Sequence, residues 1–144
     1  MIIRKMIKDD IPDLARLYKL FWNEESSILK MQGLFDDLRD NADYIILSAV
    51  ENNKIIGSIM GIICYELYGE CRPFMVIEDF IVDSKHRRKG IGKSLFLEIE
   101  KYAAKNECSY LLLVTENNRQ DAINFYTKMG FNPNKYRGFK KTLK

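Results

Sequence analysis

The feature that most constrains the fold is an apolar run over residues 73–82 that is followed by a basic, glycine-containing turn. Large apolar side chains such as Met75, Val76 and Ile77 occupy neighbouring positions of the run, which is typical of a central strand buried on both faces. A helical pattern follows over residues 90–105, and a short apolar run over residues 109–115 predicts another strand. The order strand, helix, strand predicts a βαβ unit.

The residues on either side of this unit predict further elements. Asn52 and Asn53 separate two apolar runs, and Asn tolerates the positive φ angles that a tight hairpin turn demands. The remaining expected elements are a strand over residues 2–6, a helix that begins after Asp9 or Asp10 with Pro12 in its first turn, helices over 26–39 and 119–129, hairpin strands over 44–50 and 55–66, and a closing strand over 135–143.

Composition places the chain among single folded domains. It has 144 residues, of which 47% are hydrophobic, so a single domain over residues 1–144 is expected. The apolar stretch 55–65 is shorter than the roughly 18 residues of a membrane span, and the charged N-terminus does not resemble a secretory leader. Three cysteines without a CxxC pair, and His86 alone, predict free thiols and no metal site. We therefore expect a cytoplasmic protein without membrane contact.

Positive charge is concentrated in two segments. Residues 85–93 and residues 135–144 each hold five Lys or Arg and no acid, and the rest of the chain has an excess of acids. An anionic and a cationic ligand could therefore each find a complementary surface. Tyr136 and Phe139 are the only aromatics within these segments, which is too few for a stacking platform, so no nucleic-acid partner is expected.

Two acids, Glu78 and Asp79, interrupt the apolar run. A buried carboxylate needs a partner or a raised pKa, because ionised groups are costly to remove from water. Such a pair indicates either a structural salt bridge or a site that uses the carboxylate chemically.

The turn after this strand reads Arg87-Arg88-Lys89-Gly90-Ile91-Gly92-Lys93. Its glycines allow close approach of a ligand to the backbone, and a helix N-terminus adds unpaired N–H groups and positive potential, so the turn predicts a phosphate or pyrophosphate cradle. The spellings typical of ATP-binding and NAD-binding loops do not fit. A solvated basic loop is the alternative interpretation of the turn alone.

The two motifs together resemble the GNAT superfamily of acetyl-CoA-dependent N-acetyltransferases. Residues 77–82 followed by Arg87 to Gly92 resemble the family's fourth strand and its pyrophosphate loop, and residues 121–131 resemble its second signature helix. The resemblance covers about half of the chain and implies an α/β (α+β) fold with a mixed central sheet of about six to seven strands and about four helices.

The resemblance also implies roles for individual residues. Tyr126 would protonate the departing thiolate of the cofactor as a general acid. Where the family often has an asparagine that bonds the cofactor arm, this chain has Arg119, with Asn118 one place earlier as the candidate contact. The residues implied to bind acetyl-CoA are Val82, Arg87, Arg88, Lys89, Gly90, Gly92, Lys93 and Asn118.

Acetyl transfer to a primary amine requires the amine to lose a proton, which a carboxylate can accept. The stretch around Glu78 resembles the polyamine acetyltransferase branch, which implies Glu78 as the general base, directly or through water, with Asp79 as the alternative. We expect burial to raise the pKa of Glu78. Because residues alternate across a strand, Asp79 is expected on the opposite face, where it holds a loop or attracts a cation.

The acceptor is expected to be a small cationic amine. In this family the N-terminal helices contribute to the acceptor end, and here they offer Trp22 and Glu25, an aromatic and an acid that suit a cation. Two alternatives stay open: an enzyme that acetylates a protein lysine or N-terminus, and a module that binds acetyl-CoA without turnover. The sequence leaves a homodimer open as well.

Overall fold

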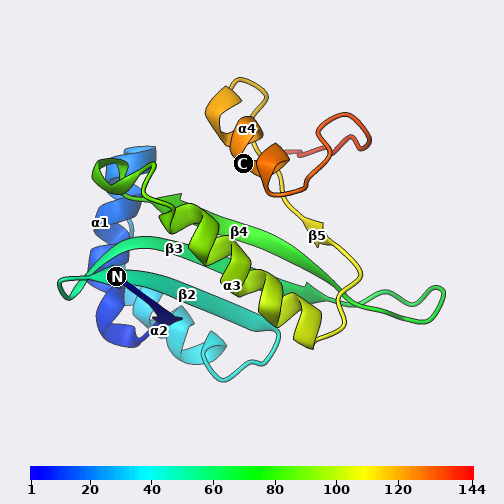
Figure 1. Cartoon of the computed structure of the whole chain (residues 1–144). Helices are drawn as coiled ribbons and strands as arrows, with labels where there is room; N and C mark the ends of the chain where they lie inside the picture. Colours follow the sequence, from blue (N-terminus) through cyan, green and yellow to red (C-terminus); the bar gives the residue numbers. More distant parts are fainter. The chain divides into compact units, whose positions relative to one another are not determined.

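The computed structural model describes all 144 residues and forms two compact units, Met1–Leu112 and Leu113–Lys144. The first unit contains β1 (Ile2–Lys5), α1 (Ile11–Trp22), α2 (Ile28–Leu38), β2 (Tyr44–Glu51), β3 (Lys54–Cys64), β4 (Phe74–Val82), α3 (Ile91–Lys105), β5 (Leu111–Leu112) and the short 3₁₀ turns Lys8–Asp10 and Ser84–His86 (Figure 1). The second unit contains α4 (Gln120–Lys128).

The five strands form one sheet in the order β1-β2-β3-β4-β5. The first four strands pair antiparallel, and β5 runs parallel to β4, so the sheet is mixed as predicted. Asn52 and Asn53 have φ angles of 50° and 59°, which confirms the predicted tight turn between β2 and β3.

The predicted strand count was too high. Residues 109–115 contribute only Leu111–Leu112, which pair with Met75 and Val76 of β4. Residues 135–143, predicted as a closing strand, contain no strand. Every residue from 135 to 144 is exposed, so this basic segment has no buried apolar face that could stabilise strand pairing.

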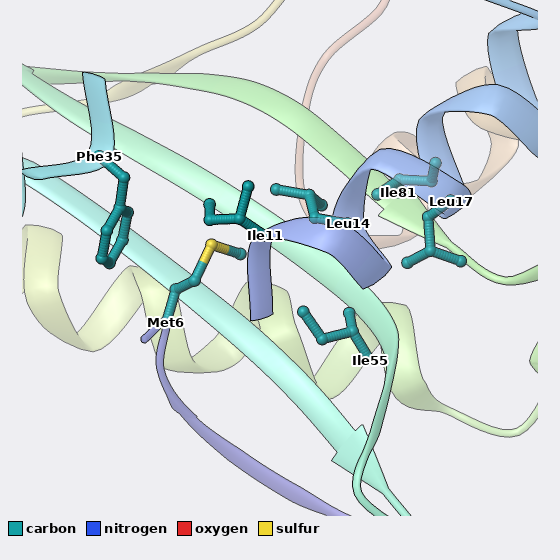
Figure 2. Packing of buried hydrophobic residues seen from close by; sticks show 7 residues of the cluster. All are labelled: Met6, Ile11, Leu14, Leu17, Phe35, Ile55 and Ile81. Atoms are coloured by element: carbon teal, nitrogen blue, oxygen red, sulfur yellow. The ribbon is translucent and has the colours of Figure 1, made fainter. Parts of the chain in front are cut away.

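Helices cover both faces of the sheet in the first unit (Figure 1). On one face, α1 and α2 pack over a buried cluster formed by Met6, Ile11, Leu14, Leu17, Phe35, Ile55 and Ile81 (Figure 2). On the other face lies α3, with Leu95, Phe96 and Ile99 fully buried.

Two glycines of β3 allow α3 to lie close to the sheet. A Cβ atom added at Gly61 would come within 2.7 Å of Sδ of Met75 and 3.0 Å of Ile99, and one at Gly57 would come within 3.1 Å of Leu95. The missing side chains therefore fix the spacing of α3, the helix that begins at the basic loop.

β4 has buried residues on both of its faces, as predicted, with Ile81 in the cluster beneath α1 and Met75 on the side of α3. Met75, Ile77 and Ile81 are buried, but the side chains of Glu78 and Asp79 are exposed. The two acids are therefore accessible to solvent although they lie within the strand. None of the helices in the structure is both long enough and apolar enough to cross a membrane.

Candidate active site

The two acids lie at a β-bulge in β4. Met60 of β3 pairs with Glu78 and Ser58 pairs with Ile81, so β4 has one more residue than β3 between these two pairs. Asp79 takes a left-handed φ of 49°, a conformation that Asp adopts more readily than most residues. A non-glycine residue in this region stores strain of about 1–3 kcal/mol, and such residues cluster at functional sites.

The bulge places both acids on the α1 side of the sheet, so the prediction of opposite faces is wrong. Met75 faces α3, where it lies against the position of a Gly61 side chain, and Glu78 three residues later therefore faces α1. Asp79 interacts electrostatically with Tyr18 of α1 and with Glu78. Beyond the bulge, Phe80 contacts Phe96 of α3, which shows that the alternation has shifted.

The surroundings of Asp79 shift the pKa of its carboxyl group. Desolvation by the surrounding atoms raises the pKa of Asp79, and the negative charge of Glu78 adds to the rise. Burial, together with the charge of Asp79, holds the pKa of Tyr18 well above its usual range. The expectation that Glu78 is a buried carboxylate is wrong, because its side chain is exposed.

An aromatic cluster at the end of α1 lies next to these groups. The ring centroids of Tyr18 and Trp22 are 5.1 Å apart, and those of Phe21 and Trp22 are 5.0 Å apart. Trp22 therefore contacts Tyr18, and Tyr18 is the residue that interacts with Asp79. Glu25, the other predicted acceptor residue, forms an exposed ion pair of 2.9 Å with Lys19.

The basic loop has the backbone geometry of an anion site. Arg88 and Gly90 have φ angles of 62° and 78°, and Gly90 occupies the N-cap position of α3 without a side-chain cap. The amide of Ser94 donates to the carbonyl of Gly90, so the three preceding amides, those of residues 91–93, have no acceptor within the helix. The loop residues Arg87, Arg88, Lys89 and Gly90 are exposed, as is Lys93, while Val82 and Gly92 are half-buried.

Arg87 joins this loop to the aromatic cluster. Its guanidinium carbon lies 5.5 Å from the ring centroid of Phe21, which is a cation–π contact. Arg87 of the loop and the predicted acid Asp79 therefore both adjoin the aromatic cluster at the end of α1.

Sequence reasoning missed a group of charged residues beneath the loop. Asp83 is buried directly after β4; its carboxylate accepts the amide of Lys85 at 3.0 Å and lies 3.6 Å from Nη1 of Arg16. Arg16 also pairs with Asp13 and donates to the carbonyl of Ile55 at 3.1 Å. No spacing rule links residues on α1 to residues after β4, so no local signal could have revealed this contact.

Tyr126 lies in α4, in the second unit. Its ring packs edge-on against Phe125 and Phe131, with centroids 5.6 Å and 5.9 Å away. Burial raises the pKa of Tyr126, while the positive charge of Arg119 opposes the rise. Arg119 occupies the N-cap position of α4, and Asn118 is exposed in the turn before it.

Comparison with known proteins gives one family. The model of the acetyltransferase (GNAT) family matches residues 11–131. YdhI, an uncharacterized protein of Bacillus subtilis (strain 168), is 36% identical over 76 residues, which cover 52% of this chain and 44% of YdhI. The chain thus matches less than half the length of this curated relative.

Solved structures with the same fold cover almost the whole chain. A candidate acetyltransferase from Agrobacterium tumefaciens str. C58 has a TM-score of 0.90 at 23% identity, with 99% of each chain covered. Glucosamine-6-phosphate N-acetyltransferase from Arabidopsis thaliana has a TM-score of 0.86 at 23% identity over 99% of this chain and 98% of that chain. An aminoglycoside acetyltransferase from an uncultured soil metagenomic sample, in complex with sisomicin, has a TM-score of 0.80 at 22% identity over 99% and 96%.

Proposed function

The chain belongs to the acetyltransferase (GNAT) family, and from this premise we propose that it transfers the acetyl group of acetyl-CoA to the primary amine of a small cationic molecule. The observation that carries the proposal is the proximity, within the first unit, of an anion-binding loop and a solvent-accessible acid pair. A loop that attracts phosphates and acids that attract a cation are what such a two-substrate reaction requires.

The loop supports binding of the diphosphate of acetyl-CoA. The free amides of residues 91–93 and the positive end of α3 favour an anion, and Arg88, Lys89 and Lys93 add exposed positive charge. Gly90 leaves the backbone accessible, since a Cβ atom there would meet no protein atom within 4 Å and would instead occupy the space of a ligand. Val82 at the end of β4, Arg87, Gly92 and Asn118 complete the proposed contacts.

The proposed chemistry is direct attack of the amine nitrogen on the thioester carbon. Glu78 accepts the proton of the ammonium group, directly or through water, and Asp79 is the alternative acceptor, supported by its raised pKa and its strained backbone. Tyr126 donates a proton to the thiolate of CoA as it departs. The raised pKa of Tyr126 supports this role, because its phenol is then fully protonated at neutral pH.

A small cationic acceptor is supported by the surroundings of the acid pair. Tyr18, Trp22 and Phe21 offer aromatic surface beside two negative charges, which suits an alkylammonium group. Two proteins of the same fold are a glucosamine-6-phosphate N-acetyltransferase and an aminoglycoside acetyltransferase bound to sisomicin. Glu25, which follows α1 and pairs with Lys19, is a further proposed contact of the acceptor.

The proposal is tested with a panel of amines and acetyl-CoA, reading the release of free CoA thiol. The panel contains diamines, polyamines, amino sugars, aminoglycosides and lysine-containing peptides. Turnover of a small amine at rates well above hydrolysis supports the proposal. Turnover of peptides alone would favour the protein acetyltransferase, and tight acetyl-CoA binding without any turnover would favour the non-catalytic module.

A further inference from the structure

The charged residues beneath the basic loop have no part in the chemistry proposed above. They are Asp13, Arg16, Glu51, Asp83 and His86, which we call the Asp83 clamp. Its members come from α1, from the end of β2 and from the turn after β4, so it ties three separate segments together.

The first half of the clamp is built around Arg16. The guanidinium pairs with Asp13 on its own helix and with Asp83, and it donates to the carbonyl of Ile55. Asp13 in turn accepts the amide of Ile55 at 2.6 Å. Hydrogen bonding to Asp13 raises the pKa of Arg16 above its usual value, although burial opposes the rise. Arg16 is thus held by three partners, the carboxylates of Asp13 and Asp83 and the carbonyl of Ile55.

The second half of the clamp is built around His86, one residue before Arg87. Nδ1 of His86 is buried without a hydrogen bond and lies 3.8 Å from the carboxylate of Asp83, while Nε2 lies 3.5 Å from Glu51. The amide of His86 donates to the carbonyl of Asp83 at 2.8 Å. Both ring nitrogens therefore face carboxylates, one at the start of the loop and one on the β2–β3 hairpin.

The loop needs such an anchor. Arg87, Arg88 and Lys89 repel one another, and Arg88 has a left-handed φ of 62° that costs a non-glycine residue free energy. At its far end the loop is fixed by α3, whose Ile91 is buried beside Gly57. At its near end the amide of Asp83 donates to the carbonyl of Ile56 at 2.8 Å, and the clamp adds side-chain contacts that hold the loop to the rest of the first unit.

We propose that Arg16 is a positioning residue for the basic loop: by holding Asp83 it keeps the loop in its anion-binding shape before acetyl-CoA arrives. The inference rests on the proposed function for the identity of the ligand. Preorganisation of this kind raises affinity because the ordering is already complete in the free protein.

Binding of acetyl-CoA by calorimetry, over a series of salt concentrations, tests the proposal. Arg16→Gln should weaken binding about tenfold, as loss of a charge-assisted contact would, with the salt dependence unchanged. Lys30→Gln is the matched control, since it removes one positive charge at an exposed position of α2 that is not part of the clamp. Lys89→Gln, in contrast, should flatten the salt dependence because Lys89 is proposed to meet a phosphate. A loss in Arg16→Gln that vanishes at high salt, as a long-range charge effect would, overturns the proposal.

A double variant tests whether Arg16 and Asp83 act on acetyl-CoA binding together or independently. Asp83→Asn together with Arg16→Gln should weaken binding no more than Arg16→Gln alone, because the two side chains act as one contact. Additive losses overturn the coupling. Glu51→Gln, a mild change at a half-buried position, should weaken binding about two- to threefold and serves if the Arg16 variant does not fold.

Hydrogen exchange in the ligand-free protein gives a readout that does not depend on acetyl-CoA. Amides of residues 84–92 should exchange faster in Arg16→Gln, while those of residues 95–103 in α3 keep their protection. Unchanged exchange at residues 84–92 overturns the inference. If exchange changes as expected but the wild-type protein binds no acetyl-CoA, the clamp stands and the proposed function fails.

Discussion

Arg87 of the basic loop lies over the ring of Phe21 at the end of α1, with 5.5 Å between the guanidinium carbon and the ring centroid. The contact joins the loop proposed to bind acetyl-CoA to the aromatic cluster proposed to bind the acceptor. This pair of side chains is a direct contact between the loop and the aromatic cluster, so its removal tests whether the cluster helps to position the loop.

Phe21→Leu should weaken acetyl-CoA binding about three- to fivefold, because a partly exposed cation–π contact is worth about 0.5–1 kcal/mol and Leu keeps the apolar packing. Calorimetry on the purified variant measures the change. Leu20→Ala, at an exposed position one residue earlier, is the control and should bind as wild type does. Equal affinity of Phe21→Leu and wild type would show that Arg87 is positioned by other groups.

Gly90→Val should abolish acetyl-CoA binding. The φ of 78° at Gly90 strains any β-branched side chain by about 1–2 kcal/mol, and the new atoms would occupy the space above the free amides of α3. Gly33→Ala, in α2 with no atom within 4 Å of the new methyl group, is the matched glycine control. It should stabilise the protein by about 0.5–1 kcal/mol and leave binding intact, as thermal unfolding and calorimetry would show.

The turns and helix ends could be predicted from the sequence, and the positive φ angles show why. Asn52, Asn53, Gly90 and Gly130 adopt left-handed φ where turn and cap chemistry required it, and the helices begin and end within a few residues of the predicted limits. These positions depend on side-chain chemistry that acts within a few residues. The family resemblance rested on two such local motifs and is confirmed by the match over residues 11–131.

The bulge at Asp79 could not be predicted, because it depends on pairing with β3. An alternating pattern carries no mark of where one strand has an extra residue, and the alternation rule therefore placed Asp79 on the wrong face. The Arg16–Asp83 contact was missed for a related reason. It forms only when the packing of α1 against the sheet brings two distant segments together.

Stability should fall as the pH falls below about 4, through the titration of Asp10. Burial raises the pKa of Asp10, but hydrogen bonds from Arg4, the amide of Ile7 and Ser48, with the charge of Arg4, outweigh it and hold the pKa below its usual value. A carboxyl with a lowered folded-state pKa contributes stability that is present above its unfolded pKa and is lost below it.

Asp10→Asn should therefore lower the free energy of unfolding by about 1–3 kcal/mol at pH 7 and by less at pH 3. Urea unfolding at both pH values measures the difference. A variant whose deficit is as large at pH 3 as at pH 7 would assign the effect to packing at β1 and α1 instead of to the Arg4–Asp10 pair.

Tyr126→Phe should lower kcat about 10²-fold or more and leave acetyl-CoA affinity within about twofold, since the hydroxyl is proposed to act only on the departing thiolate. The aromatic contacts with Phe125 and Phe131 remain in the variant. Single-turnover kinetics separate the chemical step from product release. Weakened binding with an unchanged rate of the chemical step would make Tyr126 a packing residue of α4.

The pH dependence of kcat/KM identifies the proton acceptor, because the two acids influence each other. Glu78 contributes to the raised pKa of Asp79, so Glu78→Gln should lower the pKa of Asp79. If Asp79 is the base, Glu78→Gln keeps the acidic limb of the profile and moves it to lower pH. If Glu78 is the base, as proposed, the same substitution removes the limb, and Asp79→Asn retains it.

Asp79→Asn has a second consequence that separates catalysis from folding. A carboxyl whose pKa is raised by folding destabilises the folded state once the pH exceeds its unfolded pKa, and Asn also tolerates the left-handed φ of 49°. The variant should therefore unfold at a higher temperature than wild type at pH 7, and the gain should disappear at pH 3. A gain in stability with lost activity would show that Asp79 is kept in its strained position for function; lower stability at pH 7 would contradict the assignment of the raised pKa to this carboxyl.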